Sequence, residues 1–504
     1  MRESSMLAAV DLGSNSFRLQ VGRVVGDQIY PLDSLREPVR LAAGLTPDKL
    51  LDEASQQRAV ACLRRFGERL RSLPVEAVRA VGTNSLRVAK NAPAFLKRAQ
   101  IALGFPIEVV AGREEARLIY LGVTHSLPFS SSRRLVVDIG GGSTEFIIGQ
   151  GFEPLRLESL YMGCVSFSVK YFPDGRITKG ALKRAELAAR AEVEAIAADF
   201  GPEDWEEAVG SSGTAAVLAE MLELNGFSDS GITAEGLDRL RHHLLSMGHT
   251  DRLVLAGIKP DRAQVLAGGF AIMAAVFAEL GVRRMALSSG AMRQGILYDL
   301  LGRVHRHDMR DATVTAFMER YHADRHQAAR VEALALALLD SLRGPTEESP
   351  DRRLLAWAAR LHEIGLTVAH SGYHKHSAYI IKNADMPGFS KMEQARLGAL
   401  VLSHRGGLEK MRGEIKTDAD ADLVLALRLA ALFCRNREDP RLPPLALERT
   451  KQGFRLSGPA AWMEHNPLTA YALATEAREW RAVEWQLEAP LPKGEEESPE
   501  SAVA

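Results

Sequence analysis

The sequence Val137-Asp-Ile-Gly-Gly-Gly-Ser-Thr-Glu-Phe146 decides how the rest of the chain is interpreted. An apolar stretch at 134–137 ends on Asp138, three glycines follow in succession, and Glu145 leads into a second apolar stretch. Three consecutive glycines are costly in an ordinary strand connection, because each loses extra backbone entropy on folding. We therefore expect a strand–turn–strand unit whose backbone a ligand approaches closely, with successive amide N–H groups that can bind an anion.

A second copy of this plan lies upstream. Met6–Val10 is apolar and runs into Asp11, a Gly13-Ser-Asn-Ser16 turn follows, and residues 17–21 alternate between apolar and polar as a returning strand would. The two aspartates are 127 residues apart, which indicates an internal duplication. We expect the two halves to face one another across a cleft.

Other glycine- and serine-containing turns follow apolar stretches. Gly210-Ser-Ser-Gly-Thr214 and Gly82-Thr-Asn-Ser85 each precede a predicted helix, which for the second spans 85–100. Such turns can aim amides and a helix N-terminus at an anion, or they can be plain helix caps. The apolar run Val265–Leu280 is too short for a comfortable membrane span, and we expect a buried core helix there.

The composition and the hydrophobic pattern of the sequence change near Val304. Glycine becomes sparse and long Ala/Leu/Arg helices are expected, followed after Pro440 by short alternating runs that suggest a small sheet. The tail is acidic and contains proline, so we expect disorder there. The predicted domains are 1–123, 124–303, 304–438 and 439–490, with the disordered tail at 491–504.

Composition limits the classes of function. The 504 residues are 46% hydrophobic and 25% charged, which is typical of globular domains. A net charge of −1 argues against a nucleic-acid partner. Three widely spaced cysteines, Cys62, Cys164 and Cys434, without a CxxC pair, favour a reducing compartment. No signal peptide or transmembrane segment is expected, so the prediction is a cytoplasmic protein.

The acidic residues near the turns suggest metal and acid–base chemistry. Asp138 and Glu145 flank one phosphate-binding turn, and Asp11 stands before the other. Mg²⁺ is bound by a few carboxylates together with phosphate oxygens and water, which fits this arrangement. The pair Glu114-Glu115 begins a predicted helix, where it can stabilise the helix dipole or supply a base that activates water.

From about residue 7 to residue 488 the chain resembles the exopolyphosphatase/guanosine pentaphosphate phosphatase family. The segments that carry the resemblance are AVDLGSNSF (9–17), GTNSLR (82–87), EEARLIYLGV (114–123), VDIGGGSTEF (137–146), MGCVSF (162–167), GSSGT (210–214) and LHEIG (361–365). The resemblance implies an α/β fold with duplicated actin-like, ribonuclease-H-like N-terminal domains. An all-α HD-like domain and a small C-terminal α+β domain would follow, and the family also implies a homodimer.

The family's motifs imply roles for individual residues. Glu115 is the carboxylate that activates water, Asp138 and Glu145 bind Mg²⁺ or position water, and Asp11 is a further carboxylate on the metal side. Arg87 corresponds to a cationic phosphate contact. The other implied phosphate contacts are Ser14, Asn15, Ser16, Thr83, Asn84, Gly141, Gly142, Ser143, Ser212 and Gly213.

The implied reaction is Mg²⁺-dependent hydrolysis of the terminal phosphate of inorganic polyphosphate. Gly142 and HSGYHKHSAY at 370–379 resemble the exopolyphosphatase branch, whereas the pentaphosphate phosphatase branch tends to carry alanine at the position of Gly142. Guanosine pentaphosphate (pppGpp) is the alternative substrate. An actin-fold kinase and a non-catalytic nucleotide-binding protein are the rivals from other classes, and activation by K⁺ and peripheral membrane association are left open. His362-Glu363 stands where an HD metal site needs His-Asp, so no second metal-dependent site is expected.

Overall fold

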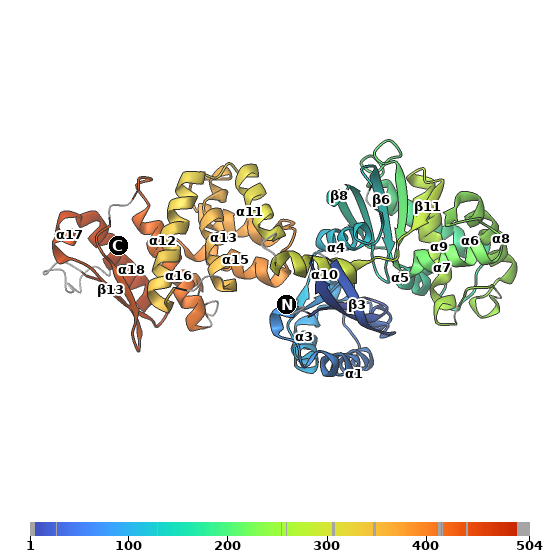
Figure 1. Ribbon diagram of the computed structural model, residues 1–504, viewed down its shortest axis with the longest axis horizontal. Helices are drawn as coiled ribbons and strands as arrows, with labels where there is room; N and C mark the ends of the chain where they lie inside the picture. The colour runs from blue at the N-terminus through green and yellow to red at the C-terminus, as the bar shows by residue number, and fades with distance from the viewer. Residues whose placement is uncertain are drawn as a thin grey trace. The chain divides into compact units, whose positions relative to one another are not determined.

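The computed structural model describes residues 6–26, 28–128, 130–253, 255–258, 260–304, 308–345, 349–411, 415, 417–439 and 442–490. The chain divides into two compact units (Figure 1). One comprises Met1–Met309 with Pro387–Lys391, and the other Arg310–Met386 with Met392–Ala504. The predicted disordered tail at 491–504 lies outside the described residues. The finer domain boundaries stay predictions.

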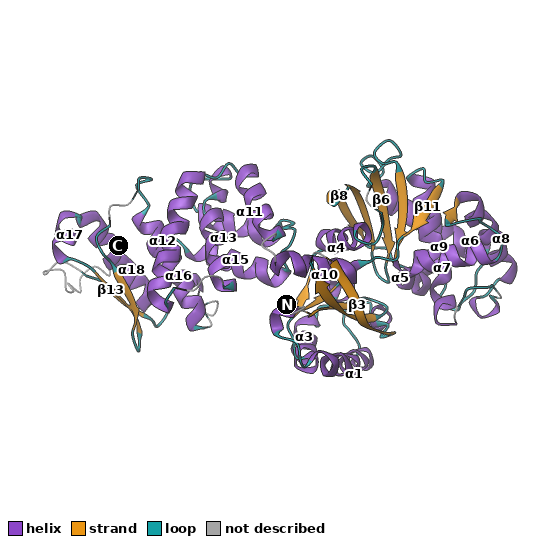
Figure 2. Ribbon diagram, in the orientation of Figure 1, coloured by secondary structure: helices purple, strands orange, loops and turns teal. Residues whose placement is uncertain are grey.

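The first unit contains two sheets built on one plan (Figure 2). The first has the order β3-β2-β1-β4-β5, with β1–β3 antiparallel and β1, β4 and β5 parallel. Its strands are β1 (Met6–Leu12), β2 (Phe17–Val25), β3 (Gln28–Glu37), β4 (Val78–Gly82) and β5 (Ile107–Val109). The alternating pattern after Ser16 therefore correctly predicted a returning strand.

The second sheet repeats the arrangement. Its order is β10-β11-β9-β6-β7-β8, again with an antiparallel hairpin beside parallel strands. Its strands are β6 (Arg133–Ile139), β7 (Thr144–Gln150), β8 (Glu153–Leu160), β9 (Glu207–Ser211), β10 (Ile232–Thr233) and β11 (Arg284–Leu287). The repeated strand order confirms the predicted duplication and the actin-like α/β architecture.

The helices of this unit cover and connect the sheets. They are α1 (Glu53–Leu70), α2 (Asn84–Val88), α3 (Ala92–Leu103), α4 (Gly112–Thr124), α5 (Cys164–Tyr171), α6 (Lys179–Glu194), α7 (Ser212–Leu224), α8 (Ala234–Met247), α9 (Pro260–Glu279) and α10 (Met292–Val304), with short 3-10 turns at Leu41–Gly44, Val75–Ala77 and Thr250–Arg252. The window Arg262–Glu279 of α9 is apolar enough to span a membrane, but 72% of it is buried. It packs against α5 and α6, so the prediction of a core helix is confirmed.

The predicted helix at 85–100 is wrong in one respect, because the chain leaves the helix between α2 and α3. Ala89 has an extended backbone, and the Asn91 side chain exchanges hydrogen bonds with the backbone of Leu51 at 2.9 and 3.0 Å. Pro93 then fits the first turn of α3, where its missing N–H costs nothing. A tertiary contact therefore overrides the local helical pattern.

Two helices cross between the sheets and hold them together. α4 packs on β7 and β8 of the second sheet, α10 packs on β1 and β2 of the first, and the two helices contact each other. The contact is close, since a Cβ on Gly295 would lie 1.7 Å from the Leu118 carbonyl oxygen and one on Gly122 would lie 2.1 Å from that of Ala291. Glycine at both positions therefore permits the approach that joins the sheets.

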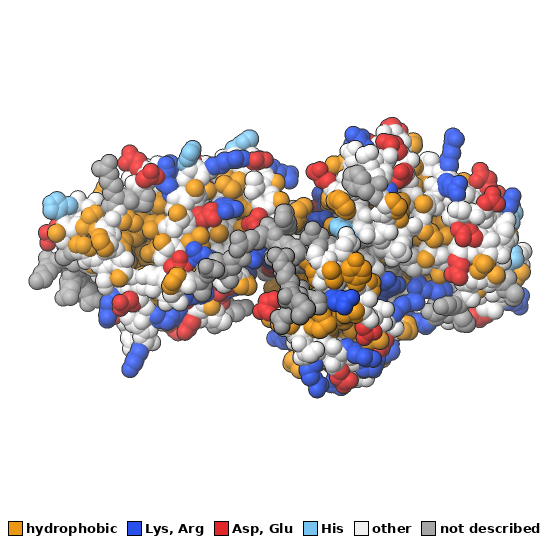
Figure 3. Space-filling view, viewed as in Figure 1, with side chains coloured by type: hydrophobic (Ala, Val, Ile, Leu, Met, Phe, Trp, Pro, Cys, Tyr) orange, Lys and Arg blue, Asp and Glu red, His pale blue; other side chains and the backbone are white. Residues whose placement is uncertain are grey.

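The second unit is mainly helical, which confirms the predicted helical C-terminal domain. Its helices are α11 (Met309–Arg320), α12 (Arg325–Arg343), α13 (Pro350–Leu361), α14 (Tyr373–Asn383), α15 (Lys391–Ser403), α16 (Asp418–Phe433), α17 (Ala460–His465) and α18 (Pro467–Arg481), with 3-10 turns at Ile364–Thr367 and Leu408–Met411. A three-stranded sheet joins β12 (Ala446–Arg449), β13 (Gly453–Ser457) and β14 (Gln486–Glu488). Acidic and basic side chains are interspersed on the faces seen in Figure 3, in keeping with the small net charge.

Candidate active site

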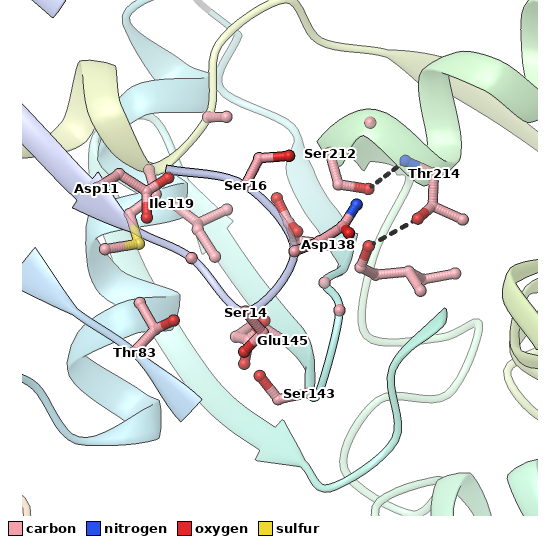
Figure 4. A pocket seen from close by; sticks show the side chains of 18 of the residues that line it. Asp11, Ser14, Ser16, Thr83, Ile119, Asp138, Ser143, Glu145, Ser212 and Thr214 are labelled. Carbon is pink, nitrogen blue, oxygen red and sulfur yellow. Dashed lines mark hydrogen bonds between the residues drawn. The ribbon is translucent and has the colours of Figure 1, made fainter. Parts of the chain in front are cut away.

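A pocket of about 130 Å³ opens between the two hairpin turns of the first unit (Figure 4). It collects residues from both sheets and from α4, α7, α9 and α10. Of the predicted site residues, it is lined by Asp11, Ser14, Asn15, Ser16, Thr83, Glu115, Asp138, Gly141, Ser143, Glu145, Ser212 and Gly213. Folding therefore brings both carboxylate-bearing turns, and Glu115 from a third segment, to one place.

Asn84, Gly142 and Arg87 lie beside this pocket rather than in its lining. A Cβ on Gly142 would lie 2.4 Å from Nδ2 of Asn84, so a larger residue there requires the Asn84 side chain or the turn to shift. Arg87 donates from Nη1 to Oε2 of Glu115 at 2.7 Å and to the Val110 carbonyl at 3.0 Å. Its contact with phosphate stays a prediction, because its recorded partners belong to the protein.

Hydrogen bonds from neighbouring segments to the carbonyl groups fix the backbone of both turns. The Ser14 and Asn15 carbonyls accept from the amides of Ala42 and Arg40 at 2.8 Å. The second turn is fixed in the same way, since the Gly140 and Gly141 carbonyls accept from the amides of residues 164–166 at 2.9 to 3.2 Å. The carbonyl groups are thereby satisfied on the side away from the pocket.

The amide groups of the turns are left available by this arrangement. In the part of the chain that the structure describes, the N–H groups of Ser14, Asn15, Gly141 and Gly142 donate to no protein acceptor. Successive unpaired amides of this kind bind phosphate oxygens well. Both turns therefore have amides available to an anion, and their contact with phosphate stays a prediction.

The carboxylates of the pocket are crowded and buried. Asp138 and Glu145 are register partners at the end of the β6–β7 hairpin. Burial, reinforced by Glu115 and Asp138, raises the pKa of Glu145 well above its ordinary value. Burial likewise raises the pKa of Asp11 to about 7 and that of Asp138 to about 6. Burial is the main cause of these shifts, and the nearby arginines, Arg18 among them, offset it only in part.

These acidic residues fit a divalent cation. Oδ1 of Asp11 is buried and has no hydrogen-bond partner, and the pKa values above indicate charge that a cation would neutralise. Among the described residues, no three His, Cys, Asp or Glu side chains form a complete metal-binding cluster. That is compatible with Mg²⁺, which commonly takes one or two carboxylates and completes its shell with phosphate oxygens and water.

The adjacent residues Glu114 and Glu115 have different environments. Glu114 is buried and accepts from Arg117 at 2.7 and 2.9 Å and from the amide of Gly388 at 2.8 Å. Glu115 instead lines the pocket. The sequence left open which of the two could act on water, and the structure assigns Glu114 to the interior and leaves Glu115 as the candidate base.

Three arginines of the pocket were missed by sequence reasoning. Arg18 stands opposite Asp11 in the β1–β2 ladder, where the second hairpin has Glu145 opposite Asp138. Arg262 and Arg293 come from α9 and α10. Comparison of the two repeats could have identified Arg18, since it occupies the position equivalent to Glu145. Neither of the other two carries a local signal that separates it from a surface arginine.

The Gly210–Thr214 segment forms the remaining wall. α7 begins at Ser212, as predicted, and Thr214 donates from Oγ1 to the Ile139 carbonyl at 3.0 Å. Ser212 has φ of 85°, a left-handed conformation that is unfavourable for a residue with a side chain. Its hydroxyl oxygen accepts from the Thr214 amide at 3.2 Å (Figure 4), which helps to hold this conformation at the edge of the pocket.

The chain matches known protein families along most of its length. The model of the Ppx/GppA phosphatase family matches residues 20–304, and the model of domain III of Ppx/GppA phosphatases matches residues 309–477. The guanosine-5'-triphosphate,3'-diphosphate pyrophosphatase of Aeromonas hydrophila is 37% identical over 492 residues, covering 96% of this chain and 99% of that protein. The protein of the same name from Pseudoalteromonas translucida is 36% identical over 493 residues, covering 96% and 98%.

A solved structure resembles part of the chain. The crystal structure of an exopolyphosphatase from Cytophaga hutchinsonii matches with a TM-score of 0.54 at 24% identity. The match covers 59% of this chain and 98% of the other. At this level of identity the likeness supports the fold alone.

Proposed function

Because the chain belongs to the Ppx/GppA phosphatase family, it is a hydrolase that acts on phosphoanhydride bonds, and we propose that it removes the terminal phosphate from inorganic polyphosphate. One observation carries the proposal: Glu115 lines the same pocket as two turns with unpaired amides. Family membership sets aside the kinase and the non-catalytic nucleotide-binding protein that the sequence left as rivals.

The pocket residues divide the reaction between them. The amides of Ser14, Asn15, Gly141 and Gly142 hold oxygens of the terminal phosphate, which fixes the phosphorus in position. Glu115 accepts a proton from the attacking water and orients it in line with the leaving chain. Phosphoryl transfer depends mainly on positioning and charge stabilisation, so a covalent nucleophile is not needed.

We further propose that Asp11, Asp138 and Glu145 hold Mg²⁺ when substrate is present. A bound cation supplies positive charge for the phosphate oxygens and for the buried carboxylates. The support is the raised pKa of Asp11 and Asp138 and the unpaired Oδ1 of Asp11. Loss of phosphate release on chelation, with recovery on adding Mg²⁺ but not K⁺ alone, would support the assignment.

Guanosine pentaphosphate is the second candidate substrate, and a specific observation favours it. The relatives that match 96% of this chain at 36–37% identity are named guanosine-5'-triphosphate,3'-diphosphate pyrophosphatases. Gly142, which pointed to polyphosphate, has a packing reason in its contact with Asn84 and so carries less weight. Arg18, Arg262 and Arg293 offer positive charge for phosphates beyond the reacting one in either substrate.

Measuring phosphate release from both substrates under one set of conditions tests these proposals. Comparable kcat/KM values would indicate one site with two substrates, and a hundredfold preference would identify the main one. Release from neither substrate in the presence of Mg²⁺ would overturn both. Because both substrates would bind in the same pocket, each is expected to inhibit hydrolysis of the other competitively.

The finer parts of the fold and the setting of the protein remain proposals. We propose that the helical domain is HD-like and is followed by a small α+β domain, with support from the match to domain III and from the three-stranded sheet beside α18. The family resemblance supports a homodimer, which light scattering at two concentrations would test. A cytoplasmic location, with or without peripheral membrane contact, is tested by cell fractionation.

A further inference from the structure

The second unit contains a pocket of its own. Its volume is about 610 Å³, within the range of small-molecule sites. It is lined by α18, by the last turns of α16 and by residues that follow α13, α15 and α16. Its lining residues all lie in the second unit, so it is separate from the pocket that contains Glu115.

Four arginines and three glutamates, Glu479 among them, line the pocket, so its lining carries a net positive charge. Arg428 is paired with Glu476, and Arg437 with Glu363 at 2.8 Å. Arg405 and Arg435 also line the pocket, and within the described chain neither forms an ion pair. We expect this excess to attract an anion.

Lys410 lies beside the lining, where its Nζ donates to the Arg405 carbonyl at 2.6 Å, and its surroundings support the same conclusion. Burial, together with Arg428 and Lys375, lowers the pKa of Lys410 to about 8. Positive groups are thus gathered closely enough to disfavour one another's charge. An anionic ligand would relieve this repulsion and be bound more tightly for it.

Two buried histidines present hydrogen-bond acceptors to the pocket. Nδ1 of His362 and of His404 lies 2.6 Å from a backbone carbonyl, so each ring carries its proton on Nδ1. Nε2 of His404 is 3.4 Å from the Tyr373 hydroxyl, which can donate to it. Nε2 of His362 faces no protein donor among the described residues, so it can accept a hydrogen bond from a ligand N–H.

The wall formed by α18 is apolar and open. Leu468 and Tyr471 line the pocket with 78% and 64% of their surfaces exposed. Leu366 and Leu432 contribute further apolar surface to the lining. A flat ring could pack here, whereas a bare phosphate chain has no group that would bury this surface.

We propose that this second pocket binds a nucleoside phosphate. Its phosphate groups pair with Arg405 and Arg435, its base packs against Leu468 and Tyr471, and a base N–H donates to Nε2 of His362. Among the described residues, Arg405 and Arg435 form no ion pair and Nε2 of His362 has no donor, so these groups are open to a ligand. The site lies outside the proposed catalytic machinery, so binding is tested independently of hydrolysis.

Hydrogen–deuterium exchange of the full-length protein locates the site directly. GDP and ADP serve as probes without divalent cation, so that hydrolysis does not interfere. Slower exchange in peptides covering 404–411 and 467–479 with either nucleotide is the expected result. Protection confined to 9–18 and 137–146, or no protection by either probe, would overturn the proposal. Equal protection of the α18 peptides by tripolyphosphate would also overturn it, because the pocket would then recognise charge alone.

Substitutions assign the binding to named residues. Arg405→Glu is expected to weaken nucleotide binding about tenfold or more, since a charged hydrogen bond is replaced by repulsion. Arg320→Glu is the matched control: Arg320 is exposed and lies 5.7 Å from the Tyr321 ring, much as Arg405 lies 5.2 Å from that of Tyr373. Tyr471→Ala, at an exposed position, is expected to weaken binding without unfolding the protein. Equal affinity in Arg405→Glu, Tyr471→Ala and the control would sink the proposal.

Discussion

Nη1 of Arg87 lies 2.7 Å from Oε2 of Glu115, at the edge of a buried group of carboxylates. The guanidinium occupies one carboxylate oxygen and leaves the other available for water. It also supplies positive charge beside Glu115, in a pocket where burial raises the pKa values of Asp11, Asp138 and Glu145. This pair therefore fixes the orientation of Glu115, and the next two predictions depend on it.

Glu115→Gln is expected to lower phosphate release about 10²- to 10⁴-fold, because the amide keeps the shape of the side chain and cannot accept a proton from water. Steady-state assays with polyphosphate and guanosine pentaphosphate measure the effect. Both substrates should be affected alike, since the same group activates water. Glu235→Gln, in the exposed first turn of α8, is the control and should retain full activity. Retention of activity in Glu115→Gln would remove the assigned role.

Arg87→Gln is expected to lower kcat through Glu115 rather than through substrate binding. Without the guanidinium, Glu115 loses its partner of opposite charge, and the pH profile of kcat/KM should change. Arg87→Gln combined with Glu115→Gln should cost little more than Glu115→Gln alone. A large rise in KM with an unchanged pH profile would instead support the phosphate contact implied by the family resemblance.

The raised pKa values of the buried aspartates predict that the metal-free protein becomes less stable as the pH rises. Asp11 has a pKa of about 7 in the folded state against an ordinary value of 3.8. Between these values the folded state holds the extra proton, so stability is full below about pH 4 and falls as the pH rises to about 7. Asp138 behaves in the same way, with its pKa at about 6.

Calorimetry of the metal-free protein from pH 4 to pH 8 tests whether its stability falls as the pH rises. Asp11→Asn should raise the Tm of the first unit at pH 8 by about 2 °C and abolish its response to Mg²⁺, while lowering activity. Wild-type protein should gain stability from Mg²⁺ at pH 8 and little at pH 5, where a protonated carboxyl binds the cation poorly. A Tm that rises with pH in the metal-free protein would contradict the assignment.

Gly142 and Asn84 should be energetically coupled. A Cβ at residue 142 would meet Nδ2 of Asn84 at 2.4 Å, so Gly142→Ala is expected to displace the Asn84 side chain or the turn and to lower activity. Gly142→Ala with Asn84→Ala should recover part of that loss, because the second substitution removes the colliding atoms. Activity and Tm of the four proteins in the cycle give the coupling, and additive losses would show that the turn itself is distorted.

The sequence predicted the features that depend on neighbouring residues. Both hairpins, with Asp11 and Asp138 at their turns, follow from apolar runs and glycines that act over a few positions. Arg293 was missed, because only the folding of α10 against the first sheet brings it to a turn far away in the chain. The choice between Glu114 and Glu115 also needed the fold, since both stand at the same helix start.

The same reasoning explains the split helix at 85–100. Pro93 is a local signal for a break, because proline disfavours a helix interior, whereas the hydrogen bonds between Asn91 and Leu51 lie outside any local window. The repeated hairpins, by contrast, contain a sequence signal for Arg18. Aligning the two repeats places Arg18 against Glu145 and so identifies a charge of opposite sign at the equivalent position.

Asp299 lies outside the pocket, and we expect its neutralisation to destabilise the folded protein strongly. Its carboxylate, on α10, bonds to Arg79 at 2.6 Å and Arg303 at 3.1 Å, and also to Arg117, which holds Glu114. Burial alone would raise the pKa of Asp299, but Arg117, Arg79 and Arg303 hold it well below its ordinary value. Asp299→Asn therefore removes the carboxylate that Arg79, Arg117 and Arg303 share, at a cost of about 3–5 kcal/mol, although Glu108 and Glu114 remain as partners of Arg79 and Arg117.

Asp299→Asn should lower the catalytic rate as well as the stability. Arg117 and Glu114 lie on α4 beside Glu115, so loosening their link to α10 should let the start of α4 shift. Well below the melting temperature, Asp299→Asn should lower kcat with little change in KM, because the phosphate-binding turns are on other segments. Asp238→Asn, at the exposed Asp238–Arg241 pair 3.9 Å apart, is the control and should change stability by no more than about 0.5 kcal/mol. If Asp299→Asn matched this control in both urea unfolding and kcat, the link would contribute nothing to holding Glu115, and α4 would be positioned by its packing against α10 at Gly122 and Gly295.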